Sequence, residues 1–175
     1  MTTRYRIIES PIGDIMLVGS DAEDDFTLGG AYLVGQRYER KIEADWVLGG
    51  VEFGLAESQF QAYFAGEISE FDVRYKGKGS EFQRSVWSGL AEIPYGTTVS
   101  YGELAERVAD RTKTRAVAAA VGRNPLSIVV PCHRVIGANG SLTGYAGGLP
   151  RKQWLLDHEI RHKGLPAEEL FLLSE

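Results

Sequence analysis

The chain has 175 residues, 43% of them hydrophobic and 25% charged, enough for the core of one ordinary domain or of two small domains packed together. This composition excludes a disordered chain, a collagen-like repeat and a disulfide scaffold, because the apolar fraction is normal and Cys132 is the only cysteine. The formal net charge of −5 disfavours nucleic-acid binding unless the charge is unevenly distributed.

The charge does differ strongly between segments. Residues 1–75 carry 6 Lys and Arg against 14 Asp and Glu, residues 76–163 carry 13 against 7, and residues 164–175 carry none against 3. Salt screens charges beyond about 8 Å, so a basic segment can attract phosphates within an acidic chain. The segment 76–163 is therefore a candidate nucleic-acid-binding region, although ordinary solvated charge also explains such an asymmetry.

The N-terminus lacks the pattern of a secretion signal, since Glu9, Gly13 and Asp14 interrupt its apolar residues. The sequence also lacks the run of roughly 18 apolar residues that a membrane span requires. We therefore expect a soluble, cytoplasmic protein with no membrane partner, in which a free thiol stays reduced.

The first half of the chain has the patterns of a small α+β domain. The expected elements are a hairpin of strands at 5–8 and 15–18, an acidic turn at 21–25, a third strand at 31–34, and a helix at 58–65 that ends at Gly66. A change in composition at 75–79 indicates a linker. We therefore assign residues 1–77 to an N-terminal domain with a structural role.

Helix signals become stronger after the linker. Capping boxes at 80–83 and 100–103 predict two helices, and a third is expected at about 114–122, behind the polar turn 110–113. The second and third helices form a helix-turn-helix pattern. A strand at 127–130, two glycine-bearing turns and a last helix with Pro150 in its first turn complete this half.

The predicted fold is therefore α+β, with a small N-terminal sheet-plus-helix domain followed by a winged helix-turn-helix-like domain at 78–165 and an acidic tail at 166–175. The third helix has an unusually small face, formed by Ala116, Ala118, Ala119 and Ala120. Alanine favours helices, so packing explains this face, but small side chains also let a helix approach a groove.

Cys132 is the candidate nucleophile. A thiol near its ordinary pKa of about 8.5 reacts well only when a base or cation stabilises the thiolate, and His133 is adjacent. Neighbouring residues of an extended chain point to opposite sides, so a turn or a bridging water is needed between them. Glu159 is the best candidate to orient His133. A buried, inert thiol is an equally weighted alternative at this point.

The pentapeptide 131–135, Pro-Cys-His-Arg-Val, resembles the active-site signature of the methylated-DNA–protein-cysteine methyltransferases, the 6-O-alkylguanine-DNA alkyltransferase family. The resemblance extends from Phe82 to Glu159, about half of the chain. Further matching segments, in the same order, are 93–96, 99–101, 115–117, 123–125, 144–148 and 154–159.

The resemblance implies a catalytic role for five residues. Cys132 is the alkyl acceptor, and His133 with a water and Glu159 forms the relay that deprotonates it. Asn124 orders the site, and Tyr101 hydrogen-bonds the departing guanine and crowds the phosphate of the flipped nucleotide.

The resemblance also implies the residues that bind DNA and the alkyl group. The small-residue helix is expected to enter the minor groove, with Arg115 filling the gap in the base stack. The DNA-binding residues are Arg115, Ala116, Ala118, Ala119, Arg123 and Tyr101, and the alkyl pocket is formed by Tyr145, Ala146, Gly147 and Val135.

The implied function is the direct reversal of DNA alkylation. The protein flips 6-O-methylguanine, and less well 4-O-methylthymine, out of double-stranded DNA and transfers the alkyl group irreversibly to Cys132 in one turnover. We expect no metal and no cofactor, since the zinc-site cysteines of some family members are absent here. We further expect a monomer in solution, associated with the nucleoid in a bacterium, with cooperative binding on DNA left open.

Two other functions compete with this one. A non-catalytic alkyltransferase-like sensor would flip the same lesion, but such proteins lack the acceptor cysteine, which is present here as Cys132. A thiol hydrolase could use Cys132, His133 and Glu159 as a triad, but the sequence reveals no oxyanion hole for it.

Overall fold

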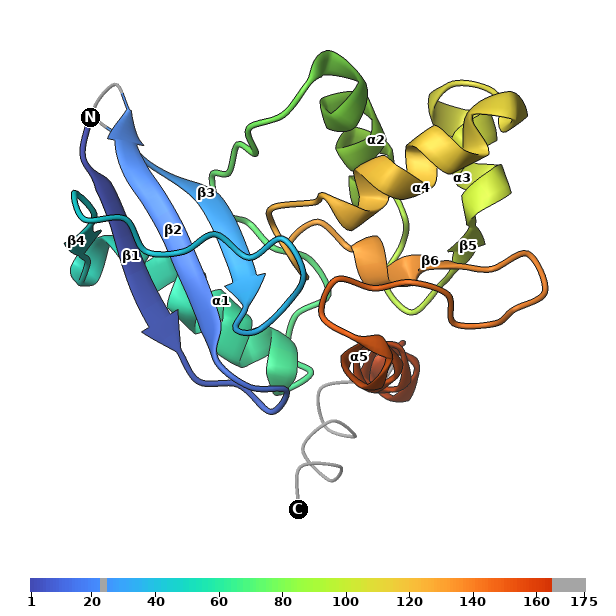
Figure 1. Ribbon diagram of the computed structural model, residues 1–175. Coiled ribbons are helices and arrows are strands. Elements are labelled where there is room, and N and C mark those ends of the chain that lie inside the picture. Colours follow the sequence, from blue (N-terminus) through green and yellow to red (C-terminus); the bar gives the residue numbers. More distant parts are fainter. Residues whose placement is uncertain (23–24, 165–175) are drawn as a thin grey trace.

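The computed structural model describes residues 1–22 and 25–164, so the predicted acidic tail at 166–175 lies outside the described residues. Strands and helices follow one another in a mixed order (Figure 1). They are β1 (Thr3–Ile8), β2 (Ile15–Ala22), β3 (Asp25–Leu33), β4 (Val47–Leu48), η1 (Val51–Phe53), α1 (Gly54–Phe64), α2 (Glu81–Ala91), β5 (Val99–Ser100), α3 (Tyr101–Val108), η2 (Arg111–Lys113), α4 (Thr114–Gly122), η3 (Cys132–Arg134), β6 (Val135–Ile136) and α5 (Leu149–His162). Within the described part of the chain, no helix has the length and apolarity to cross a membrane.

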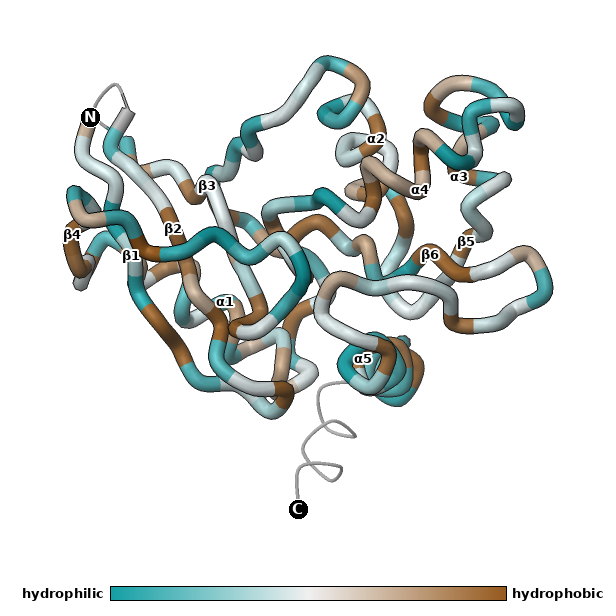
Figure 2. The backbone as a smooth tube through the Cα atoms, in the orientation of Figure 1, coloured by the Kyte–Doolittle hydropathy of each residue, from teal (hydrophilic) through white to brown (hydrophobic). Residues whose placement is uncertain are grey.

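The N-terminal half is a four-stranded sheet with strand order β3-β2-β1-β4, and α1 packs behind it (Figure 1). The predicted hairpin is confirmed, because β1 and β2 pair antiparallel from Thr3 opposite Ser20 to Ile8 opposite Ile15. Hydrophobic residues gather where the end of β1 meets the start of β2 (Figure 2), and the start of β2 is buried on both faces. Ile15 and Leu17 belong to the main core, whereas Met16 and Val18 pack with Tyr32 and Trp46. The predicted third strand is also present.

Two boundaries in this half differ from the prediction. β3 begins at Asp25 rather than at residue 31, because Asp21 and Phe26 still pair across the strands and the apolar residues Phe26 and Leu28 face the core. Most of the predicted acidic turn is therefore strand. α1 begins at Gly54, before the predicted start at residue 58, because the short η1 turn leads directly into it.

The edge of β3 joins the two halves of the molecule. The backbone of Leu28 exchanges hydrogen bonds with Arg74 and Lys76, and the backbone of Ala31 does so with Pro125 and Ser127, all at 2.8–3.0 Å. One hydrophobic cluster continues from the sheet through α2 and α4 to Leu155 on α5. The N-terminal sheet therefore holds the segment that precedes Cys132.

The predicted helices of the second half are present. Both capping boxes form, with the Ser80 and Ser100 hydroxyls accepting from the backbone N–H three residues later. α3, η2 and α4 form the expected helix-turn-helix, packed against α2 (Figure 1). The predicted small-residue face of α4 is not exposed along its whole length. Ala120 is buried, and its backbone carbonyl accepts a 2.9 Å hydrogen bond from Trp87 Nε1.

The predicted strand at 127–130 is wrong. Residues 124–130 form a tight turn with isolated bridges, and Ile128 has a φ of +74°. Proline at 125 and at 131 removes two N–H donors, so this apolar segment enters the core instead of pairing in a ladder. Among the described residues of this half, the strands are the two-residue parallel pair β5 and β6.

Gly66 ends α1 where it meets α5, and we expect its replacement by alanine to destabilise the protein. Its φ of +78° disfavours any side chain, and a Cβ would collide with the His162 ring. Gly35→Ala is the matched control, because its φ is +86° but the surrounding space is open. Urea unfolding should show a loss of about 1–2 kcal/mol for Gly35→Ala, from strain alone, and a clearly larger loss for Gly66→Ala. Equal losses would contradict the packing of α1 against α5.

Candidate active site

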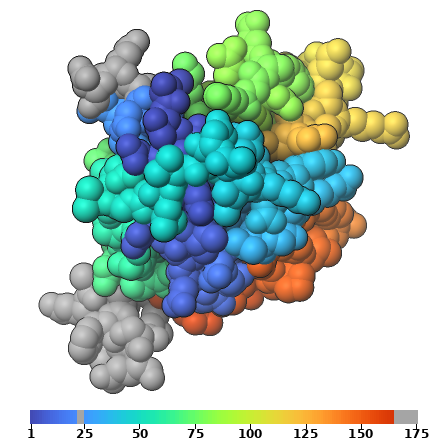
Figure 3. Space-filling view, turned by 60° about the vertical axis from the view of Figure 1, so that its left-hand side comes forward, coloured from blue at the N-terminus to red at the C-terminus, as the bar shows by residue number. Residues whose placement is uncertain are grey.

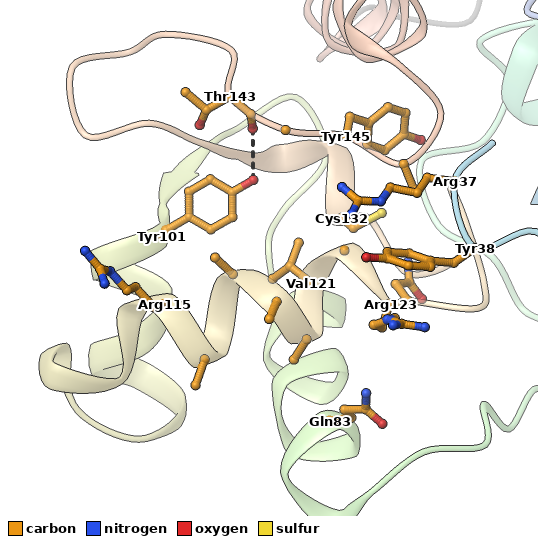
Figure 4. A pocket seen from close by; sticks show the side chains of 18 of the residues that line it. Arg37, Tyr38, Gln83, Tyr101, Arg115, Val121, Arg123, Cys132, Thr143 and Tyr145 are labelled. Carbon is orange, nitrogen blue, oxygen red and sulfur yellow. Dashed lines mark hydrogen bonds between the residues drawn. The ribbon is translucent and has the colours of Figure 1, made fainter.

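A cavity of about 960 Å³ opens along one side of α4 (Figure 4). Its walls come from α4, from the N-terminal end of α3, from the loop after β6 and from the segment that follows β3. The lining residues include Cys132, Tyr101, Tyr145 and Ala146. The cavity therefore brings together residues that are distant in sequence.

Cys132 begins the short η3 turn, where Pro131 redirects the backbone out of the core. Its side chain is only 6% exposed and faces the cavity (Figure 4). Burial raises the pKa of the thiol, and a hydrogen bond from Asn124 and the positive charge of Lys152 lower it in part. The thiol is thus accessible to a small group in the cavity but stays protonated at rest.

His133 and Glu159 meet as predicted. Both side chains have no exposed surface, and His133 Nε2 lies 2.7 Å from Glu159 Oε1. Because an ionised carboxylate only accepts, Nε2 carries the proton and Nδ1 has a free lone pair. Nδ1 is buried and has no hydrogen-bond partner among the described residues.

Arg134 is a functional residue that sequence reasoning missed. Its guanidinium donates to both oxygens of Glu159, with Nε 2.9 Å from Oε2 and Nη2 2.7 Å from Oε1, and Nη1 donates to the Ile93 carbonyl. The η3 turn makes this possible, because it turns Cys132 toward the cavity and the next two residues toward α5. Its place directly after the Cys-His pair was the signal available in the sequence.

The N-terminal half also reaches this carboxylate. The Tyr63 hydroxyl on α1 donates to Glu159 Oε1 at 3.0 Å, across 96 residues of sequence. The backbone N–H of Gly96 adds a bond of 3.3 Å to Oε2. Nothing local to Tyr63 in the sequence distinguishes it from an ordinary core aromatic residue.

These contacts fix the charges of the site. Burial alone would raise the pKa of Glu159, but His133 and Arg134 hold it well below its usual range. Burial lowers the pKa of His133 despite the neighbouring carboxylate. Because Arg134 already balances the charge of Glu159, the imidazole is neutral near pH 7 and able to accept a proton.

Lys152 is a second residue that the sequence did not reveal. Its ammonium is fully buried and donates to the carbonyls of Val135, Thr143 and Gly144 at 2.6, 3.3 and 3.2 Å. Burial lowers its pKa to about 8. It holds the loop before Tyr145 in place and favours the thiolate form of Cys132 by its charge.

Asn124 and Tyr101 shape the two ends of the site. Asn124 accepts from Leu126 N–H at 3.0 Å and donates to the Val130 carbonyl at 2.8 Å, which fixes the turn before the thiol. The Tyr101 hydroxyl donates to the Thr143 carbonyl at 3.0 Å. Burial and the nearby Cys132 raise its pKa, so it stays a proton donor.

The predicted DNA-binding residues line the cavity, Tyr101 from α3 and the others from α4 and its C-terminal end. Arg115, Ala116 and Ala119 are exposed on α4, Ala118 is half-buried, and Arg123 is at the end of this helix. Of the predicted alkyl-pocket residues, Tyr145 and Ala146 line the cavity. Val135 is instead buried in the core on β6, and Gly147 lies outside the lining residues.

Known proteins resemble this chain over most of its length. A family profile described as the DNA-binding domain of 6-O-methylguanine DNA methyltransferase matches residues 81–161. Proteins named methylated-DNA--protein-cysteine methyltransferase are 51% identical in Mycolicibacterium paratuberculosis, over 90% of this chain and 93% of the relative, and 49% identical in Methanosarcina acetivorans, over 89% and 97%. The crystal structure of Mycobacterium tuberculosis OGT in complex with DNA is 45% identical, with a TM-score of 0.85, over 91% of this chain and 94% of that one.

We expect Arg134→Met to cost about 3–5 kcal/mol of unfolding free energy, because it leaves the Glu159 carboxylate buried without its main counter-charge. Arg111→Met is the control, since it removes an arginine from an exposed pair with Glu106 and should leave stability nearly unchanged. Urea unfolding at pH 7 measures both. If the two variants unfold alike, the buried charge network does not stabilise the fold.

We also expect the protein to lose stability in mild acid. The pKa values of His133 and His158 are lowered by burial, so both bind protons more readily when unfolded, and their contribution is lost as the pH falls below the ordinary value of 6.5. Urea unfolding from about pH 7.5 to about pH 5 should show this decrease. His158→Gln keeps an N–H donor for the Tyr63 carbonyl and should show a smaller decrease. A flat profile for the unchanged protein would refute the neutral, buried histidines.

Proposed function

Because the chain belongs to the methylated-DNA–protein-cysteine methyltransferase family and is a DNA alkylation-repair enzyme of that class, we propose that it transfers the alkyl group of 6-O-methylguanine to the sulfur of Cys132. One observation carries this proposal: the thiol lies in the wall of the cavity, next to the buried His133–Glu159–Arg134 network. The substrate is double-stranded DNA, with 4-O-methylthymine as a poorer substrate by the family resemblance alone.

The position of the thiol supports a reaction with a flipped nucleotide. The O6 alkyl group of guanine is shielded within a duplex, whereas Cys132 lies inside a cavity beside α4 and is almost fully buried. Extruding the base costs a few kcal/mol, and less when alkylation has already weakened its pairing. The exposed Ala116 and Ala119 let the backbone of α4 approach the groove, and Arg115 extends from its first turn to occupy the emptied position in the stack.

The transfer begins with removal of the thiol proton. The lone pair of His133 Nδ1 takes this proton through a bridging water, while Glu159 accepts from Nε2 and Arg134 keeps the carboxylate ionised. The thiolate attacks the alkyl carbon, so a C–S bond forms as the C–O bond breaks, and the electron pair of that bond goes to guanine. Lys152 stabilises the thiolate by its charge.

Tyr101 completes the transfer on the leaving-group side. Its hydroxyl lies at the cavity and keeps its proton because its pKa is raised. When this hydroxyl turns its single proton from the Thr143 carbonyl to guanine, the donation offsets the negative charge that develops as the C–O bond breaks. The thioether left on Cys132 has no good leaving group, so each molecule reacts once, without a cofactor.

The test is the mass of the protein after incubation with a duplex that contains one 6-O-methylguanine. We expect a gain of about 14 Da, stoichiometric and confined to the peptide that contains Cys132. Cys132→Ser should show no gain but should still bind the lesion, since the serine is nearly the same size. An unchanged mass with tight lesion binding would indicate a sensor instead, and an unchanged mass without binding would refute DNA repair.

A further inference from the structure

The segment after β3 brings two side chains of the N-terminal half into the cavity. Arg37 and Tyr38 line it together with Cys132 and Tyr145 (Figure 4). The backbone N–H of Arg37 donates a 2.8 Å hydrogen bond to the backbone carbonyl of Ala146, so this segment is hydrogen-bonded to the predicted alkyl-pocket loop. In the space-filling view, the pale blue and cyan segment lies between the gold end of α4 and the orange loop (Figure 3). The N-terminal half therefore forms part of the cavity mouth.

The backbone of this segment is held in one conformation. Gln36 is 7% exposed, and its Oε1 accepts from the Leu33 N–H at 2.6 Å and from the Ser127 hydroxyl at 3.3 Å. Arg151 on α5 donates to the Val34 carbonyl at 3.0 Å. Tyr38 has a φ of +61°, a conformation that costs energy for a bulky residue. Such strain persists only where the surrounding contacts fix it, and it is concentrated at functional sites.

Tyr38 carries an arginine against each side of its ring. The guanidinium carbon of Arg123 lies 3.6 Å from the ring centroid and that of Arg37 lies 4.8 Å away, with the ring between them in Figure 4. Within residues 1–22 and 25–164, neither guanidinium donates a hydrogen bond to any protein acceptor. Both groups are thus fixed by stacking but keep their N–H donors free.

Two guanidinium groups stacked on the same aromatic ring repel each other, and an anion bound by both would offset this repulsion. A planar guanidinium with free donors binds carboxylate or phosphate best, and stacking on an aromatic ring fixes it before the ligand arrives. The cavity that these arginines border also contains Arg115 and the exposed face of α4. Phosphate is therefore the anion that fits their surroundings.

We propose that Arg37 and Arg123, stacked on Tyr38, bind phosphates of the DNA strand that carries the flipped nucleotide. The N-terminal half then takes part in DNA binding, although it is acidic as a whole and its sequence suggested only structural support. This inference rests on the proposed function.

The experiment measures binding to a duplex that contains 6-O-methylguanine as a function of salt concentration, using the full chain with Cys132→Ser to prevent reaction. Each phosphate contact contributes about 0.9 to the slope of log K against log salt. Arg37→Gln should bind roughly five- to tenfold more weakly at about 0.1 M salt and should lower the slope by about one.

Arg40→Gln is the matched control. Arg40 also stacks on an aromatic ring, with its guanidinium carbon 4.6 Å from the centroid of Trp46, but it pairs with Glu43 and does not line the cavity. Arg40→Gln removes the same positive charge from the same N-terminal half and should leave the slope of log K against log salt unchanged. Equal changes in Arg37→Gln and Arg40→Gln would mean that net charge alone is responsible, and would overturn the proposal.

A second measurement separates phosphate binding from a general defect of the site. The free base 6-O-benzylguanine has the reacting bond but no phosphate, so Arg37→Gln with Cys132 intact should lose much less of its reaction rate with the free base than with DNA. A loss of this reaction equal to the loss with DNA would overturn phosphate binding. If the unchanged protein acquires no alkyl mass from either substrate, the proposed function fails, whereas the salt slopes still decide whether Arg37 binds phosphate.

Discussion

The active site depends on one buried carboxylate. Glu159 has no exposed surface, yet it accepts hydrogen bonds from His133, Arg134 and Tyr63. An ionised carboxylate without these partners would be too costly to bury, and it would capture a proton instead. Because Arg134 neutralises it, Glu159 can orient the imidazole without drawing a proton from solvent. The base next to Cys132 is therefore neutral and ready before any substrate arrives.

The same carboxylate explains why the two halves of the chain share one core. Tyr63 belongs to α1, and Glu159 belongs to α5, so the hydrogen bond between them joins the first half to the last helix. The edge of β3 makes a second junction, because Ala31 pairs with the turn that Asn124 fixes in front of the thiol. A disturbance of the sheet is thus transmitted to the catalytic segment through backbone hydrogen bonds rather than through a flexible linker.

Much of this arrangement could be predicted from local sequence patterns. Helix boundaries followed from the capping residues Ser80 and Ser100, whose side-chain bonds are local and depend little on the rest of the fold. The pairing of His133 with Glu159 followed from chemical requirements and from the family resemblance. The strand expected at 127–130 failed, because its apolar pattern reports burial and not hydrogen bonding.

Other residues could not have been found in this way. Tyr63, Lys152 and Arg37 reach the site from elements that are far apart in sequence or that have unremarkable composition. Their contribution depends on tertiary packing, which single-sequence patterns do not encode. Arg134 is intermediate, since its motif marked the position but only the tight η3 turn directs it to the opposite side from Cys132.

In the proposed reaction Cys132 is used once, so the thiol must be protected from other electrophiles. Cys132 meets this requirement through its environment, because it is almost fully buried and its pKa is raised, so the reactive thiolate is scarce at rest. Reactivity then requires both a base that is already neutral and a substrate that fills the cavity and excludes bulk water. His133 meets the first condition, and in the proposed mechanism the flipped nucleotide meets the second. The burial that slows the free thiol therefore also restricts its reaction to groups that enter the cavity.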